Sequence, residues 1–312
     1  MHPDEAERNR GEAGPPSHEQ EKELVSVIVP TYNRSRSIGK CLESLLAQSH
    51  TNVEIIISDD NSSDHTVDIV TEFMRRDTRI GLVRSPVNTG AGGARNRALS
   101  QAHGDYVFYT DDDVEVPADW ISTGLRIFSD TGCSGIEGQI EYVSATYQPR
   151  YSDRAIYNRT GNHFMLANMA YRRDALVKAG PMNEDLRIME DRELAFRVME
   201  FGDIVFAKEF FVTHMRDELT FKSFILEARR TAAWVPFNIL SKRRDQMVGC
   251  VYRPDKLLTL AFPPLIFMRF FTATRFESPL DYVLVLALYP RLWYERILVW
   301  KWAIRYRKFI IL

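Results

Sequence analysis

Short apolar runs alternate with segments of helical periodicity from residue 24 onward. β-Branched and aromatic residues in these runs predict strands. The runs occupy residues 24–29, 53–58, 80–83 and 106–110. Between them, apolar positions recur at the spacing of an amphipathic helix, for example within residues 38–46. This alternation predicts an α/β fold of the Rossmann-like kind, with a mostly parallel central sheet flanked by helices.

Polar clusters follow three of the predicted strands. They are Thr31–Arg34, Asp59–Asn61 and Asp111–Asp113. Because ligands of such sheets bind outside the carboxyl ends of the strands, we expect the three clusters to form one binding edge. Repulsion among three adjacent carboxylates would raise a pKa or recruit a cation, and their oxygen atoms suit Mg²⁺ or Mn²⁺ better than zinc. Taken alone, the third cluster is equally compatible with a solvated acidic loop.

A glycine-rich segment precedes the fourth predicted strand. Gly90-x-Gly92 begins like a dinucleotide-binding fingerprint, but Arg95 stands where that pattern needs a small residue. The segment also follows the third strand rather than the first, so a dinucleotide cofactor is disfavoured. Small residues at a helix start still let a ligand approach the backbone. Arg95 is either a partner for a phosphate or base edge, or a solvated side chain.

Residues 131–215 have a less regular pattern, with strands predicted over 133–143 and 161–171. Residues 189–198 predict a helix in which Asp191 shares a face with Ala195 and Val198. Burial on that face would raise the pKa of Asp191, which suits a general base. The alternative is an acidic residue favoured by the helix dipole. His214 ends another strand-like run and becomes a site candidate only if the fold brings it to the acidic cluster.

Composition limits the classes of function. The chain has 312 residues, 45% of them hydrophobic, and a net charge of −2, which gives no reason to expect a nucleic-acid partner. Seven acids, three bases and few apolar residues at the start predict a disordered acidic tail over 1–23 that is not a secretory signal. The three cysteines lie far apart, which disfavours zinc or a disulfide framework and favours the cytosol.

The last part of the chain is basic and aromatic. Residues 241–312 contain thirteen bases and five acids. Two apolar segments, 257–271 and 282–302, are too short or too interrupted for a membrane span, which needs about twenty residues. Tryptophans interleaved with basic residues suit a helix lying in a membrane interface, so we expect peripheral membrane contact. A helical layer packed on the preceding domain and an oligomer contact are the alternatives.

In five segments the chain resembles the family 2 glycosyltransferases of the GT-A fold. The segments are 25–34, 57–64, 88–96, 111–113 and 180–191. The resemblance implies a catalytic domain over 24–220, with a nucleotide-binding half at 24–113 and an acceptor half at 114–220. A helical extension over 221–312 follows. The chain departs from the processive synthases, because Arg230 and Trp234 are all that remains of their QxxRW motif.

The resemblance also implies a role for each candidate residue. Donor-nucleotide binding is assigned to Pro30, Thr31, Tyr32, Asn33, Arg34, Asp60, Gly90, Arg95, Asp111 and Asp112. Mn²⁺ or Mg²⁺ is assigned to Asp113, with Asp111 and His214 as further contacts. Asp111 and Asp113 are expected to project to the same side of an extended segment. Asp191 is assigned as the general base, with Glu190 and Asn168 on the acceptor side.

The implied reaction moves a sugar from a nucleotide-diphospho-sugar to a hydroxyl of a saccharide or lipid-linked saccharide, with inversion, in cell-surface polysaccharide or glycolipid synthesis. The expected location is the cytoplasm, at the inner face of the cell membrane. A sugar-phosphate nucleotidyltransferase is one alternative, but it usually has a basic glycine-rich loop where this chain has residues 31–35. A non-catalytic carbohydrate or membrane scaffold is the other, and the intact acidic residues at 111–113 and 191 disfavour it.

Overall fold

The computed structural model describes residues 23–232, except 145, 148, 149, 151 and 218, and residues 276–305. The strands are β1 (Val25–Thr31), β2 (Val53–Asp59), β3 (Ile80–Arg84), β4 (Tyr106–Thr110), β5 (Val114–Glu115), β6 (Gly135–Tyr142), β7 (Asn168–Arg172) and β8 (Ile204–His214). The helices are α1 (Ile38–Leu46), α2 (Thr66–Arg76), α3 (Ala91–Leu99), α4 (Trp120–Thr131), α5 (Arg173–Ala179), α6 (Glu190–Val198), α7 (Phe221–Leu226), α8 (Ala228–Ala232) and α12 (Pro279–Arg305). The predicted acidic tail, apart from its last residue, and the apolar segment 257–271 lie outside the described residues.

The eight strands form one sheet in the order β3-β2-β1-β4-β7-β6-β8-β5. β1, β2, β3 and β4 are joined by parallel ladders, as are β6 and β8, whereas β7 and β5 pair antiparallel to their neighbours. The predicted α/β class, with a mostly parallel sheet flanked by helices, is confirmed. Antiparallel β7 beside β4 marks the change from the regular first half to the second half of the sheet.

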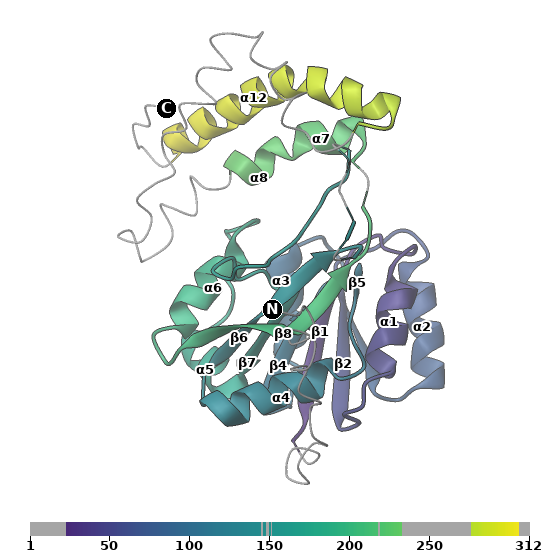
Figure 1. Ribbon diagram of the computed structural model, residues 1–312, viewed down its shortest axis with the longest axis vertical. Coiled ribbons are helices and arrows are strands. Elements are labelled where there is room, and N and C mark those ends of the chain that lie inside the picture. Colours follow the sequence, from purple (N-terminus) through teal and green to yellow (C-terminus); the bar gives the residue numbers. More distant parts are fainter. Residues whose placement is uncertain are drawn as a thin grey trace, which may run out of the picture.

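Helices cover both faces of the sheet (Figure 1). α1, α2 and α4 contribute to one apolar core, and α3, α5 and α6 contribute to a second core on the opposite face. β1 and β4 lie between these two layers, so all their residues are buried, as expected for parallel strands covered on both sides. Cys41 and Cys133 are free and buried.

Several strand boundaries differ from the sequence expectation, those of β1 and β7 among them. β1 continues through Pro30 to Thr31, because its ladder with β4 ends at Ile28 and Pro30 pairs only with β2. β7 begins only at Asn168, since the residues before it form a loop around the buried carboxylate of Glu137. Glu137 accepts hydrogen bonds from three successive backbone N–H groups in 162–164, a local arrangement that competes with an extended strand.

The described part of the C-terminal region forms a helical layer of α7, α8 and α12 (Figure 1). α12 is a single helix that continues through Pro290. Its buried Asp281 accepts hydrogen bonds from the backbone N–H groups of Glu277 and Ser278 and from that of Ser152, in the loop before β7. Among the helices that the structure describes, none has both the length and the apolar character needed to cross a bilayer.

Candidate active site

The three polar clusters lie at one edge of the sheet, as predicted. Thr31 pairs with Asp59 at the ends of β1 and β2, and the N–H of Asp60 donates to the carbonyl of Thr31. β4 is parallel to β1, so the acidic turn that follows Thr110 emerges at this same edge. The parallel order of β2, β1 and β4 therefore places residues from three distant segments around one region.

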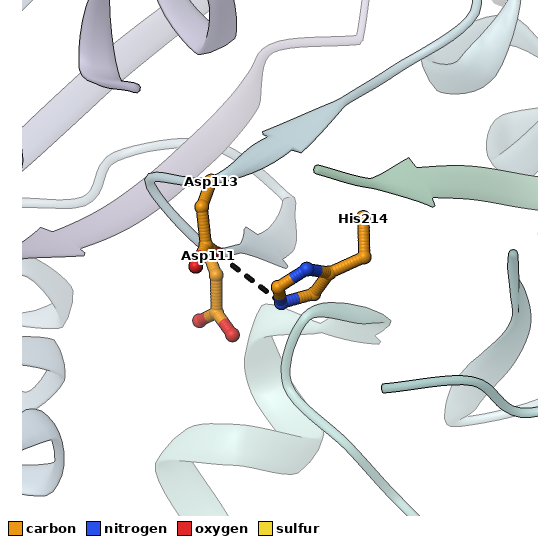
Figure 2. A group of neighbouring side chains, drawn as sticks. All are labelled: Asp111, Asp113 and His214. Carbon is orange, nitrogen blue, oxygen red and sulfur yellow. Dashed lines mark ion pairs between the residues drawn. The ribbon is translucent and has the colours of Figure 1, made fainter. Parts of the chain in front are cut away.

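His214 joins the acidic cluster. Ligand atoms of Asp111, Asp113 and His214 all lie within 4.8 Å of one another (Figure 2). The cause is backbone pairing: Val114 of β5 is paired with His214 of β8, and the N–H of Met215 donates to the carbonyl of Asp113 at 2.8 Å. Asp112 and Asp113 lie in a turn rather than the expected extended segment, and this turn leads directly into β5.

The donor set of this cluster fits a hard divalent cation. The Nδ1 atom of His214 lies 2.9 Å from the carbonyl of Met215, which can only accept, so Nδ1 carries the proton. Nε2 faces Asp113, whose Oδ1 is 3.3 Å away, and in the neutral ring this nitrogen is the one that would bind a cation. Two carboxylates and one imidazole would leave coordination positions for substrate oxygens, which suits Mn²⁺. Mg²⁺ would also fit, bound by the two carboxylates without the imidazole.

Arg34 partly neutralises the acidic turn. Its guanidinium lies 3.3 Å from Asp112 and 3.4 Å from Asp113. Burial nevertheless raises the pKa of Asp112 to about 7, and it also raises the pKa of Asp113, although His214 and Arg34 act in the opposite direction. The turn therefore holds more carboxylate than its nearby cations balance, which is the condition under which a metal ion binds.

The loop after β2 is fixed to the glycine-rich segment through Asp60. This carboxylate accepts hydrogen bonds from Thr89 and from the N–H of Gly90, and it pairs with Arg97 at 2.7 Å. Burial raises the pKa of Asp60, but these hydrogen bonds outweigh it and the pKa is lowered. Gly90 has φ of 88°, a conformation that favours glycine, so this residue lets the loop turn toward Asp60.

The loop after β1 is held by the loop after β2. The side chain of Asn33 accepts from the N–H of Ser63, and the N–H of Arg34 donates to Thr66. Tyr32 stays about half exposed at this edge, whereas Pro30 and Thr31 are buried beneath it. These contacts order the predicted nucleotide-binding loop, and its exposed members remain candidates for donor contact.

The segment with the predicted base reaches the same edge from α6. Asp191, in the first turn of α6, is half-buried and accepts from the N–H of Arg192. Burial, together with the charge of Glu190, raises the pKa of Asp191 to about 7. Glu190 is buried and pairs with Arg95, which in turn pairs with Asp111. Arg95 thus links the acidic turn to the start of α6.

Asn168 pairs with Thr110, the last residue of β4 before the acidic turn, but its side chain is enclosed by the protein. Predicted on the acceptor side, it is fully buried, with its amide bound to Trp120, to the carbonyl of Gln139 and to the carbonyl of Phe210. These contacts join α4, β6, β7 and β8, so in this conformation no surface of Asn168 is available to an acceptor.

Sequence reasoning also missed Arg97 as the ionic partner of Asp60. The sequence clue was its position two residues after Arg95 in the same short helix, which marked a second arginine near the site.

Comparison with known proteins agrees with this geometry. Residues 26–178 match the family model of glycosyl transferase family 2. The putative teichuronic acid biosynthesis glycosyltransferase TuaG of Bacillus subtilis is 41% identical over 113 residues, which make up 36% of this chain and 45% of that protein. The UDP-Glc:alpha-D-GlcNAc-diphosphoundecaprenol beta-1,3-glucosyltransferase WfaP of Escherichia coli is 44% identical over 103 residues, or 33% and 39% of the two chains. The chain thus spans less than half the length of either relative.

Among solved structures, the mannosyltransferase PcManGT of Pyrobaculum calidifontis, in complex with GDP-Man and Mn²⁺, superposes with a TM-score of 0.58 at 16% identity. The match covers 89% of this chain and 87% of that one. The sheet, its helices and the site edge define an α/β protein of the GT-A fold. Over residues 26–178 the chain belongs to glycosyltransferase family 2.

Proposed function

We propose that this protein is an inverting, metal-dependent glycosyltransferase that moves a sugar from a nucleotide-diphospho-sugar to an acceptor hydroxyl. The observation that carries the proposal is the cluster of Asp111, Asp113 and His214 at the sheet edge, to which Arg95 links Glu190, the neighbour of Asp191. Family membership supports the same conclusion, and so do structures of this fold with UDP-GlcNAc and with GDP-Man and Mn²⁺.

The proposed chemistry divides between the two halves of the site. Asp113, Asp111 and His214 would hold Mn²⁺ or Mg²⁺, which when bound neutralises the charge that builds on the departing nucleotide diphosphate. Asp60 and the loop 31–34 would line the pocket of the nucleotide base. Asp191 would take the proton from the acceptor hydroxyl as its oxygen attacks the anomeric carbon. A single base and direct displacement invert the configuration of that carbon.

The donor and acceptor classes follow from the relatives. WfaP carries in its name a UDP-Glc donor and a diphosphoundecaprenol-linked acceptor, and TuaG is named for teichuronic acid biosynthesis. We therefore infer that the acceptor of this protein is a saccharide or lipid-linked saccharide in cell-surface polysaccharide or glycolipid synthesis. The expected site of action is the cytoplasmic face of the cell membrane.

The exposed face of α12 supports peripheral membrane contact. Leu284 and Ala287 of α12 are buried in a cluster with Leu219 and Phe224. The opposite face of α12 is apolar and exposed, with exposed fractions of 42% for Trp293 to 79% for Ile304. Its large side chains are Tyr282, Val283, Leu286, Trp293, Ile297, Trp300 and Ile304. Lys301 and Arg305 are also exposed on this helix, and cations beside tryptophan favour an anionic lipid surface.

Product analysis tests the activity. The purified protein is incubated with Mn²⁺, a panel of nucleotide sugars that includes UDP-glucose, and a lipid-linked diphosphosaccharide acceptor. Transfer should occur, and the anomeric proton of the product should show a configuration opposite to that of the donor. Retention of configuration would contradict the single-base mechanism. Release of pyrophosphate from a sugar 1-phosphate and a nucleoside triphosphate would instead favour the nucleotidyltransferase alternative.

Sedimentation with liposomes tests the membrane contact. Wild type and a Trp293→Glu/Ile297→Glu variant are compared on vesicles with and without anionic lipid. Wild type should sediment with anionic vesicles, and the variant should lose most of that binding while still hydrolysing a soluble nucleotide sugar at the wild-type rate. Equal partition of the two proteins would show that this face of α12 is not the lipid contact.

A further inference from the structure

Arg95 occupies a bridging position between the two halves of the site. It lies in α3 and is only 6% exposed. One terminal nitrogen is 2.7 Å from Oδ1 of Asp111, and the other is 3.3 Å from Oε1 of Glu190. These two carboxylates are 79 positions apart in the sequence, and a single guanidinium joins them. Within the described part of the chain, its Nε has no hydrogen-bond partner.

Three carboxylates surround the single positive charge of Arg95. Burial lowers the pKa of Arg95, but the carboxylates of Asp111, Glu190 and Asp191 outweigh burial and raise it. The cation is therefore firmly charged, and several carboxylates compete for it. Any change in the charge that Asp111 presents must alter how strongly Arg95 is attracted to Glu190, because Arg95 and Glu190 are buried and Asp111 is only partly exposed.

The residue after Arg95 holds the acceptor half in a second way. The side chain of Asn96 accepts from the N–H of Met182 and donates to the carbonyl of Met182 and to Glu184. α3 is thus attached both to the start of α6 and to the segment that leads to it. The donor-binding role that the sequence suggested for Arg95 would require its guanidinium to leave both carboxylates.

We propose that Arg95 is a positioning residue that couples cation binding at Asp111 to the placement of Glu190 and Asp191 at the start of α6. The inference rests on the proposed function, since it takes Asp111 as part of the cation site and Asp191 as the base. A cation that neutralises Asp111 leaves more of the Arg95 charge for Glu190. Conversely, without the charge of Glu190 the guanidinium of Arg95 pairs more strongly with Asp111. Asp111 then attracts a metal cation less, because such coupling is reciprocal.

A double-mutant cycle on Mn²⁺ binding tests the coupling without any turnover. Mn²⁺ alone is titrated calorimetrically into wild type, Glu190→Gln, Arg95→Lys and the double variant. Lysine keeps the charge but offers a single point donor, so it cannot hold both carboxylates as the planar guanidinium does. Glu190→Gln should weaken Mn²⁺ binding about fivefold or more in the wild-type background. The same substitution should have little effect in the Arg95→Lys background.

Glu193→Gln is the matched control for this cycle. Glu193 lies one turn further along α6, is buried, and has its own partner, Arg197, at 2.8 Å. Its substitution should leave Mn²⁺ affinity unchanged. An undiminished Glu190→Gln effect in the Arg95→Lys protein would show direct through-space attraction and overturn the coupling. An absent effect in the wild-type background would overturn it as well.

Steady-state kinetics separate positioning from donor binding. Arg95→Lys should lower kcat by about tenfold to a hundredfold, as expected for a displaced base, while leaving the donor dissociation constant unchanged. A weaker donor constant with unchanged kcat would make Arg95 a donor-binding residue instead. Melting temperatures of all variants confirm that each is folded. If the protein transfers no sugar at all, the proposed function is wrong. The double-mutant cycle on Mn²⁺ binding still measures the coupling between Arg95 and Glu190 in that case.

Discussion

At the scale of single residues, the site contains several carboxylates and only a few cationic side chains that pair with them. Asp112, Asp113 and Glu190 are buried, and Arg34 and Arg95 are the cations that pair with this group. Carboxylates buried in this way are costly unless paired or bound to metal, so their presence needs a functional reason. The proposed function gives them two tasks: the turn 111–113 would bind a cation, and Asp191 would accept a proton.

The first residue-scale prediction concerns Asp191. Asp191→Asn keeps the size of the side chain but removes the basic oxygen, so kcat should fall about a hundredfold or more while donor binding is retained. Rapid-quench transfer assays and donor calorimetry measure the two quantities. Wild-type turnover in Asp191→Asn would mean that another group accepts the proton.

The second residue-scale prediction concerns pH. A general base works only when ionised, and burial together with the charge of Glu190 raises the pKa of Asp191 to about 7. At saturating Mn²⁺ and donor, kcat should therefore be lost as the pH falls through about 7 and should level off above it.

The control for that profile removes the like charge. Glu190→Gln should move the acid limb of kcat to lower pH, because the charge of Glu190 is the second cause of the raised pKa of Asp191. Because burial also raises the pKa of Asp112 to about 7, Mn²⁺ affinity is followed over the same pH range to exclude loss of the cation. A limb at about pH 4, where an ordinary aspartate titrates, would contradict the assignment.

At the scale of elements, the junction of β6, β7 and β8 supports the second half of the site. β6 has an irregularity between Gly138 and Gln139, where the amide of Asn168 reaches the carbonyls of Gln139 and Phe210. A Cβ at Gly138 would collide with that amide and with the Phe210 carbonyl. Glycine is therefore required there by close approach.

This junction gives the element-scale prediction. Gly138→Ala should lower the free energy of unfolding by about 1–3 kcal/mol, because the Asn168 amide or the β8 backbone must move. Urea denaturation measures the change. Gly39→Ala in α1 is the matched control: a Cβ there would meet nothing closer than 3.9 Å, so no loss is expected. Equal stability of the two variants would show that the junction tolerates the shift.

What the sequence could and could not predict also follows element by element. Asp60, Asp111 and Asp113 were found because strand periodicity and the parallel-sheet rule locate the carboxyl ends of strands. The burial of Asn168 was not found, since its partners come from three distant segments and no local pattern encodes them. The ion pair between Arg95 and Glu190 was missed for the same reason. β7 was predicted to begin too early, because backbone N–H groups before it donate to the carboxylate of Glu137 and not to a neighbouring strand.

At the scale of the whole molecule, the helical layer is attached near the candidate cation site. Asp281 of α12 accepts a hydrogen bond from the N–H of Ser152. Asp153, which follows Ser152, pairs with Arg216 at 2.9 Å. Arg216 follows His214 by two positions, so a short chain of contacts runs from α12 to the proposed cation ligand His214. The predicted domain boundaries at residues 23, 113 and 220 remain predictions.

Docking of this layer gives the molecule-scale prediction. Asp281→Ala removes the acceptor for three backbone N–H groups and should cost about 1–3 kcal/mol of stability. Hydrogen exchange should increase in α12 and in the loop around Ser152 together. Asp130→Ala, at an exposed position of α4, serves as the control with little expected change. Exchange that rises in α12 alone would show that the layer is not fastened through this contact.

Calorimetric titration of nucleotide sugars with and without Mn²⁺ tests the central claim most directly. UDP-glucose, UDP-N-acetylglucosamine and GDP-mannose are titrated into wild type and Asp113→Ala. One of these donors should bind wild type only when Mn²⁺ is present, and Asp113→Ala should lose that binding because the cluster loses a carboxylate ligand. Binding that is equally tight in EDTA, or equally tight in Asp113→Ala, would contradict a cation-dependent donor site at this edge of the sheet.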